Sequence, residues 1–164
     1  MCKIIKNNNE LSNLIDTFDR ENIQIIMVNG CFDLFHVGHL SLLKFAKSQG
    51  DILIVAINSD YSISKLKGSS RPIIPQNDRL AILSSLIYVD YVMVFEDENP
   101  STLINIIKPD AIVKEEEYKS KKISETDTIK KYNIDLIFYK KENNVSTSSI
   151  INKVLSSSKN INQA

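Results

Sequence analysis

The chain contains little of what supports a disulfide scaffold or a repeat protein. Two of its 164 residues are cysteines, Cys2 and Cys31, too few for a disulfide framework and too far apart in sequence for a metal clip, so we expect free thiols. Glycine and proline number four each and form no linker, and there is no internal repeat or coiled-coil pattern. We expect one domain over residues 1–155, with its core at 24–155, and a polar, frayed tail at 156–164.

Excess charge and long apolar runs are also missing. Basic and acidic residues balance at 20 each, so no overall field attracts nucleic acid or an anionic membrane, and any phosphate site must be local. Hydrophobic residues make up 43% of the chain, but no stretch approaches the ~20 residues of a membrane span. The first residues have no apolar core with a cleavage site, which argues against a secretory signal. We expect a cytoplasmic protein that binds neither nucleic acid nor membrane.

Helix and strand periodicities alternate along the chain. Apolar residues at helical spacing predict an amphipathic helix over residues 9–20, and the β-branched run at 24–28 predicts a buried parallel strand. Residues 59–71 are predicted to form a polar loop. Further strands are predicted at 51–57, 91–95, 111–113 and 134–139, and further helices at 37–49, 76–88, 100–107, 124–132 and 147–155. The alternation predicts a doubly wound parallel α/β sheet, in which ligands bind at the carboxyl ends of the strands.

The most informative segment is residues 30–39, GCFDLFHVGH, which follows a predicted strand and contains both histidines of the chain. His36 and His39, at the start of a helix, can present both imidazoles to one side, near unpaired backbone N–H groups and the positive end of the helix dipole. Gly30 lets a phosphate approach the main chain, and Gly38 allows close approach between the imidazoles. This pattern predicts an anion site. The alternatives are a core histidine beside a surface one, or half of a metal site, although a protein-held metal needs more ligands than this segment offers.

Two further polar segments follow predicted strands and suit phosphate groups. The loop after the strand at 51–57 carries three cations and a glycine, and Lys67 and Arg71 are the candidates to fold over phosphates there. Four hydroxyl residues, Ser146 to Ser149, stand at the start of the last predicted helix, where they would cap it. Ser146, Thr147 and Ser148 are the candidates to bind a phosphate there, together with the free N–H groups of the helix. A solvated surface loop and a capping role alone are the alternatives for these segments.

The pattern G-x-F-D-x-x-H-x-G-H at residues 30–39 resembles the signature of the cytidylyltransferase-like nucleotidyltransferases. The resemblance implies a Rossmann-like nucleotidyltransferase fold and transfer of a nucleotidyl group from a triphosphate to a substrate phosphate, with Mg²⁺ and without a covalent enzyme intermediate. It implies that His36 and His39 are catalytic and stabilise charge on the α-phosphate by positioned electrostatics. Nucleotide contacts are implied for Gly30, Cys31, Phe32 and Gly38, and a substrate contact is implied for Asp33.

Further segments are similar to the heptose 1-phosphate adenylyltransferases of that family, from about residue 25 to residue 154. The matching segments are 55–60, 67–72, 89–92, 108–110, 113–114, 118–119 and 146–151. The similarity implies transfer of AMP from ATP to a sugar 1-phosphate, giving an ADP-sugar for lipopolysaccharide or another surface glycan. It implies a catalytic role for Lys67, nucleotide contacts for Arg71, Lys114 and Ser146 to Ser148, and substrate contacts for Asn58 and Asp60. Some members carry a fused sugar kinase; here we expect a kinase on a separate chain, and a homodimer.

One departure from the resemblance concerns residues 113–118. The adenylyltransferases usually read V-K-G-G-D-Y there, whereas this chain has Glu115 and Glu116 in place of the glycines. The two glutamates restrict the backbone and add charge beside the expected nucleotide, or form a solvated acidic loop tip. CTP-dependent transfer to glycerol 3-phosphate or a related alcohol phosphate is the alternative within the class. A regulator that binds nucleotide without turnover, and a structural partner subunit, are the alternatives from other classes.

Overall fold

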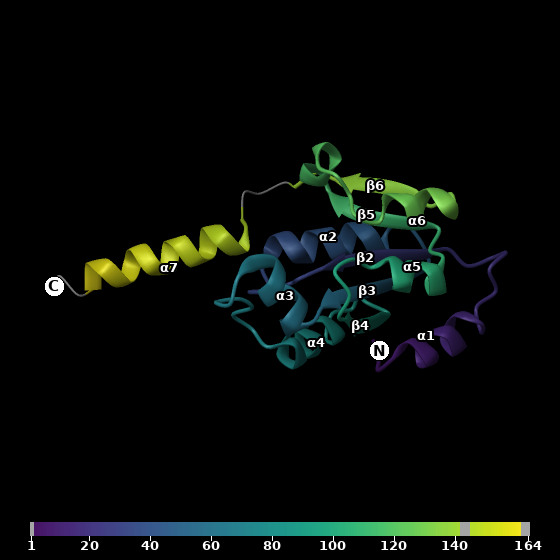
Figure 1. The fold of residues 1–164 in the computed structure, drawn as a ribbon, viewed down its shortest axis with the longest axis horizontal. Helices are drawn as coiled ribbons and strands as arrows, with labels where there is room; N and C mark the ends of the chain where they lie inside the picture. Colours follow the sequence, from purple (N-terminus) through teal and green to yellow (C-terminus); the bar gives the residue numbers. More distant parts are fainter. Residues whose placement is uncertain (1, 142–144, 162–164) are drawn as a thin grey trace.

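A six-stranded, all-parallel sheet organises the computed structural model, which describes residues 2–141 and 145–161 (Figure 1). The strand order is β1-β4-β3-β2-β5-β6. Strands β2 to β4 extend the sheet on one side and β5 and β6 on the other, so the order reverses between β2 and β5. The strands are β1 (Lys3–Ile5), β2 (Ile25–Gly30), β3 (Ile52–Asn58), β4 (Tyr91–Phe95), β5 (Ala111–Glu115) and β6 (Asp135–Tyr139).

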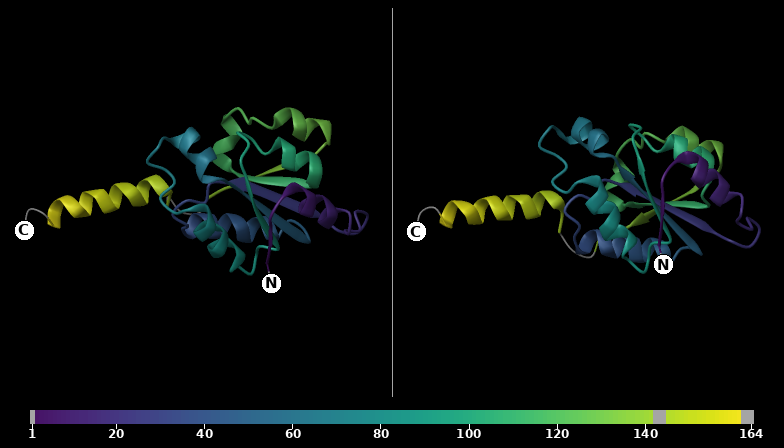
Figure 2. Two further views of the ribbon diagram at one scale, coloured as in Figure 1. Left: turned by 60° about the horizontal axis from the view of Figure 1, so that its bottom comes forward. Right: turned by 90° about the horizontal axis from the view of Figure 1, so that it is seen from below.

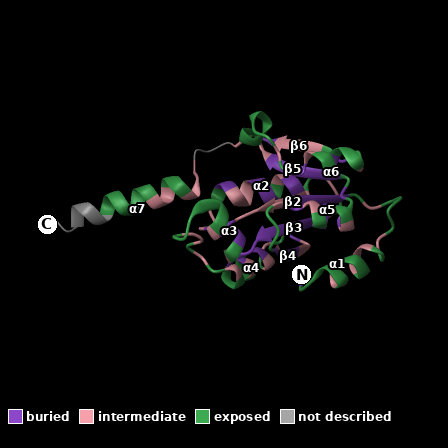
Figure 3. Cartoon of the chain, viewed as in Figure 1, coloured by how far each residue is buried: buried purple, intermediate pink, exposed green. Residues whose placement is uncertain are grey.

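Helices cover both faces of the sheet, because its central strands carry apolar side chains on both sides. On β2, Ile26 and Val28 belong to the core on one face, and Ile25 and Met27 belong to the core on the other. The first face is covered by α2 (Val37–Lys47) and α4 (Gln76–Ser84), and the second by α1 (Asn8–Ile15), α5 (Ser101–Ile107) and α6 (Thr126–Lys131). Figure 3 shows the buried layer along the centre of the molecule. The predicted doubly wound α/β fold is confirmed.

The last helix, α7 (Thr147–Ile161), projects away from the body of the molecule, as Figure 1 and both views of Figure 2 show. Its first turn is held at the carboxyl edge of the sheet, where Thr147 Oγ1 donates a hydrogen bond of 2.8 Å to the carbonyl oxygen of Asp33. Ser146 and Ser149 cap the helix reciprocally, each backbone N–H donating to the hydroxyl of the other. The helix continues beyond its predicted end, and the last residues of the predicted tail lie outside the described residues.

The predicted polar loop at residues 59–71 is wrong, because much of it forms a helix, α3 (Asp60–Lys67). Ser59 caps this helix by accepting the backbone N–H of Ser62 at 3.1 Å, and Ile63 is fully buried. The helix has few buried apolar side chains, so its sequence shows little periodicity. As a result, Lys67 lies at the end of a helix and not within a long flexible loop.

Other differences from the predicted elements are local. The edge strand β1 and a 3₁₀ helix at Glu116–Ser120 were not predicted, since the first has three residues and the second is polar. Helices α1 and α4 end at Ile15 and Ser84, earlier than their apolar spacing predicts. No helix in the described ranges is long and apolar enough to cross a membrane.

Candidate active site

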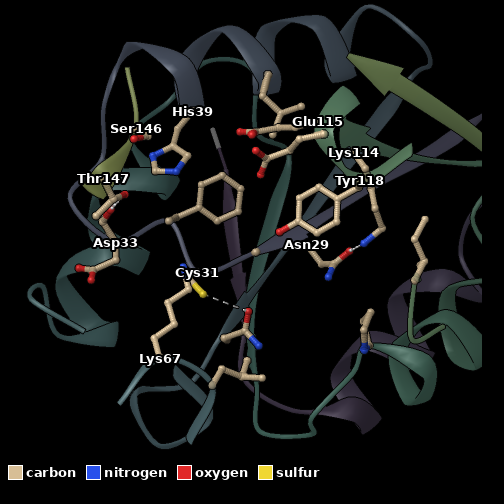
Figure 4. A pocket seen from close by; sticks show the side chains of 18 of the residues that line it. Asn29, Cys31, Asp33, His39, Lys67, Lys114, Glu115, Tyr118, Ser146 and Thr147 are labelled. Carbon is tan, nitrogen blue, oxygen red and sulfur yellow. Dashed lines mark hydrogen bonds between the residues drawn. The ribbon is translucent and has the colours of Figure 1, made fainter. Parts of the chain in front are cut away.

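A cavity of about 630 Å³ opens at the carboxyl ends of the central strands (Figure 4). Asn29 and Gly30 end β2, Asn58 ends β3, and Lys114 and Glu115 end β5, and all five line the cavity. This is the point where the strand order reverses, which is the usual binding site of open parallel sheets. The volume suits a small-molecule ligand.

The cavity has two chemically different ends, which Figure 4 separates. One end, here called the histidine end, holds His39, Asp33, Lys67, Ser146 and Thr147. The other, here called the lysine end, holds Asn29, Lys114 and Tyr118. The histidine end combines imidazoles, an exposed lysine and the first residues of α7, so it suits an anion. The lysine end offers an amide, a paired lysine and an aromatic ring, which suit a flat polar group.

His36 and His39 stand together, with their rings stacked at a centroid distance of 3.8 Å. His36 is the N-cap of α2, and its Nδ1 accepts the backbone N–H groups of Gly38 at 3.1 Å and His39 at 3.4 Å. Because Nδ1 accepts two hydrogen bonds, the ring proton of His36 lies on Nε2. The Nε2–H group of His36 is therefore available to donate a hydrogen bond to a ligand.

His39 is the more buried histidine of the pair. Its ring lies 5.2 Å from that of Phe32 and 5.6 Å from that of Phe35, and its Nδ1 has no hydrogen-bond partner among the described residues. Burial, and then the charges of His36 and Lys141, lower the pKa of His39 to about 3. Burial and Lys141 also lower the pKa of His36. Both rings are therefore neutral hydrogen-bond donors at neutral pH, not cations.

The stability of the protein should fall as the pH drops from 7 to 5, in part because of His39. The pKa of His39 rises from about 3 in the folded protein to its ordinary 6.5 when the chain unfolds, so the unfolded state binds more protons in this window. His39 alone should then lower the free energy of unfolding by about 2 kcal/mol between pH 7 and pH 5. Urea denaturation at a series of pH values measures this loss.

His39→Gln is the matched variant for this measurement, because glutamine does not titrate. Its free energy of unfolding should fall less between pH 7 and pH 5 than that of the wild type, while the carboxylates contribute equally to both proteins. Equal losses in the two proteins would contradict the low pKa of His39.

Asp33 and Arg71 hold the loop after β2 and have little freedom for other contacts. The Asp33 carboxylate, 1% exposed, accepts Arg71 Nε at 2.7 Å and the backbone N–H groups of Ile73 and Ile74 at 2.9 Å. Burial alone would raise the pKa of Asp33, but these donors outweigh it and keep the pKa below its ordinary value. Asp33 lines the cavity, whereas Arg71 does not, since its guanidinium is bound to Asp33.

Some of the remaining predicted site residues line the cavity and others do not. Cys31, Phe32, Asn58, Lys67 and Ser148 all line the cavity. Asp60 does not, because its carboxylate accepts Arg79 Nη2 at 2.7 Å and the backbone N–H of Gln76 at 3.1 Å. Gly38 does not line it either; a Cβ at that position would stand 3.0 Å from the ring of His36, so the glycine allows the histidine cap to form.

Lys114 lies in the cavity but is already neutralised. Its Nζ is 2.5 Å from Glu125 Oε1 and donates to Asn29 Oδ1 at 3.0 Å, and both ionic side chains are almost fully buried. Burial would raise the pKa of Glu125, but the charge of Lys114 and the hydroxyl of Ser124 lower it below its ordinary value. This lysine is therefore less suited to a phosphate than its charge suggests.

Sequence reasoning missed several charged residues that line the cavity, namely Glu98, Glu117, Lys122, Glu125 and Lys141. Lys141 follows β6, pairs with Glu115 at 2.5 Å and lowers the pKa of both histidines. It stands in a polar run with no motif, so only the fold brings it to the histidines. Glu115, predicted as either a nucleotide neighbour or a solvated loop tip, lines the cavity as the partner of this lysine.

The sequence and the fold of this chain resemble those of known proteins. The family model described as Cytidylyltransferase-like matches residues 27–153. Bifunctional protein HldE of Helicobacter pylori is 46% identical over 88% of this chain and 30% of that protein, and the protein of the same name from Campylobacter jejuni subsp. doylei is 41% identical over 93% of this chain and 32% of that protein. The chain thus spans about 30% of the length of the curated relatives it matches.

Among solved structures, the lipopolysaccharide core biosynthesis protein from Thermoplasma volcanium superposes with a TM-score of 0.61 at 28% identity, covering 74% of this chain and 99% of that one. The family model's range, residues 27–153, includes both histidines, the loop after β2 and the strand ends that line the cavity. The chain therefore belongs to the cytidylyltransferase-like family.

Proposed function

We propose that this chain is a nucleotidyltransferase that transfers AMP from ATP to a heptose 1-phosphate and releases pyrophosphate. The observation that carries the proposal is the stacked, neutral pair of His36 and His39 at the carboxyl end of β2, in a cavity that also receives the start of α7. The names of the relatives, which include a lipopolysaccharide biosynthesis protein, support a sugar phosphate as the acceptor. The product would be an ADP-sugar for a surface glycan.

The triphosphate binds at the histidine end and the nucleoside at the lysine end. The histidine end offers the exposed Lys67 and the first N–H groups of α7, both of which favour anionic oxygens. At the lysine end the charge of Lys114 is cancelled by Glu125, and the phenol ring of Tyr118 forms part of the wall. An uncharged ribose and base fit there better than a phosphate does.

The reaction needs no covalent enzyme intermediate. An oxygen of the sugar phosphate attacks the α-phosphorus of ATP, and the bond from that phosphorus to the bridging oxygen of pyrophosphate breaks. Negative charge builds on the oxygens of the α-phosphate, and the N–H donors of His36 and His39 stabilise it. The strands and helix starts keep the donors in place before the substrate arrives.

Mg²⁺ enters with the triphosphate rather than at a site formed by the protein. Three cavity carboxylates are paired with cations, Asp33 with Arg71, Glu115 with Lys141, and Glu125 with Lys114. Within residues 2–141 and 145–161, no three His, Cys, Asp or Glu side chains are grouped to hold a metal ion. Phosphate oxygens, water and the two other carboxylates that line the cavity, Glu98 and Glu117, are the ligands available to this cation, which usually keeps several waters beside substrate phosphates.

Two further expectations concern partners. A sugar 1-phosphate is formed by transfer of a phosphoryl group to a sugar, so we propose that a kinase supplies this substrate. We also propose a homodimer, supported by exposed apolar side chains on α4 and just after it, among them Ile82 and the 87% exposed Ile87.

Pyrophosphate release with a panel of substrates tests the proposal. We expect turnover with ATP and heptose 1-phosphate, and little with CTP or with glycerol 3-phosphate. Turnover with CTP alone would contradict the adenylyl donor and favour the cytidylyltransferase alternative. Nucleotide binding without pyrophosphate release from any pair would contradict the activity and favour a regulator.

A further inference from the structure

A fully buried arginine, Arg79, binds four acceptors at the carboxyl edge of the sheet. Its Nη1 donates to the carbonyl oxygens of Cys31 at 2.7 Å and Asn58 at 2.9 Å. Its Nε donates to the carbonyl oxygen of Ile74 at 3.0 Å, and its Nη2 donates to Asp60 Oδ1 at 2.7 Å. One guanidinium on α4 thus joins the ends of β2 and β3 and the segment before α4.

The loop that Arg79 holds is strained. Phe32 and Leu34 have φ values of 50° and 49°, in the left-handed region that residues with a Cβ rarely adopt. Such a backbone persists only where the surroundings hold it from several sides. Arg79 holds it at the carbonyl of Cys31, directly before Phe32, and the Asp33 carboxylate holds it from the segment after α3.

We propose that Arg79 is a positioning residue for the transfer reaction: it fixes the turn at residues 30–34 so that the backbone of this turn and His36 meet the α-phosphate in the productive geometry. This inference rests on the proposed function. Arg79 does not line the cavity, so it acts through Cys31, a lining residue whose carbonyl oxygen it binds.

The charge and the shape of arginine both matter here. Three backbone carbonyls and a carboxylate surround the side chain, and only a planar fork of N–H donors reaches all four at once. A lysine offers one compact ammonium and would leave some of these buried acceptors unpaired. Asp60 orients the guanidinium of Arg79 by accepting a hydrogen bond from Nη2, so this carboxylate acts without contacting the substrate.

Chemical rescue of Arg79→Ala tests the proposal on the full chain. We expect kcat to fall about ten- to a hundredfold, with the Kd for ATP changing less than about threefold, because a displaced turn misaligns the reacting groups. Methylguanidinium should enter the vacated space and restore kcat by about tenfold, whereas Arg79→Lys should remain slow. Arg20→Ala is the matched control, since Arg20 also bonds a backbone carbonyl, that of Lys108, but at the opposite edge of the sheet. Methylguanidinium should not change its kcat.

Asp60→Asn provides a second variant with the arginine in place. It keeps the shape of the acceptor and should lower kcat a few-fold without changing the midpoint of thermal unfolding by more than the control does. The proposal is overturned if folded Arg79→Ala keeps wild-type kcat, or if methylguanidinium restores its thermal stability but not its kcat. A wild-type protein that releases no pyrophosphate would overturn the proposed function instead, so the two failures are distinct.

Discussion

Replacing either His36 or His39 with alanine is expected to lower kcat by about 100- to 1000-fold, or roughly 3–4 kcal/mol, the usual cost of one preorganised donor to a transition-state anion. The effect falls on kcat because charge develops on the α-phosphate oxygens only as the reaction proceeds. The affinity for ATP should change little. Single-turnover rates and the Kd for ATP, measured on variants with native circular dichroism, separate the two quantities.

The double variant tests whether the two rings serve one phosphate. Since the rings are stacked, the second substitution should cost less than the first, and the combined loss should fall short of the product of the single losses. A single variant that keeps near-normal kcat would show that its histidine is not catalytic. If neither variant folds, the pair is structural and the assignment fails.

Lys114→Met is expected to cost about 3–5 kcal/mol of the free energy of unfolding, because it leaves a buried carboxylate without its counter-charge. Glu125 is 3% exposed, and Lys114 is the only cation that the described residues bring to it. The double variant Lys114→Met with Glu125→Leu removes both charges and should recover most of this loss. Urea denaturation of the wild type and the variants measures the difference.

The matched control is Lys121→Met, which breaks a pair with Glu117 in which both side chains are more than half exposed. An exposed pair of this kind contributes about 0–1 kcal/mol, so the control should stay near the wild type. Equal losses of the free energy of unfolding in Lys114→Met and Lys121→Met would contradict the prediction. So would a double variant that is no more stable than Lys114→Met, because the unpaired carboxylate of Glu125 would then not be the cause of the loss.

Elements with a strong local pattern could be predicted from the sequence. The strand at 91–95 was predicted with its observed ends, since an apolar run lies between charged residues. Helix α3 was missed because few of its side chains are buried, and β1 because it has three residues and depends on pairing with β4. In both cases the fold supplies the stabilising contacts, and the local sequence does not.

The candidate site also contains residues that a local pattern reveals and residues that only the fold brings together. The histidine pair could be found because its members lie three residues apart in one segment, and their spacing alone brings them together. Arg71 and Asp60 were predicted to contact ligands but do not line the cavity, because each binds a partner of opposite charge from a distant segment, Asp33 and Arg79 respectively. Asp33 does line the cavity, and its contact with substrate stays a prediction. The partners of Lys141 and Glu125 likewise become visible only once β5, β6 and α6 are placed.

The cap formed by His36 ties catalysis to the start of a helix. The Nδ1 atom of His36 accepts the first N–H groups of α2, and the same ring lines the cavity. A proton on Nδ1 would therefore break the cap and, at the same time, turn the neutral hydrogen-bond donor at Nε2 into part of a cation. Alanine at this position loses a helix cap as well as a catalytic group. Asparagine, which also caps helices, removes the imidazole alone. Acid, by contrast, cannot inactivate His36 without loosening the first turn of the helix that carries His39.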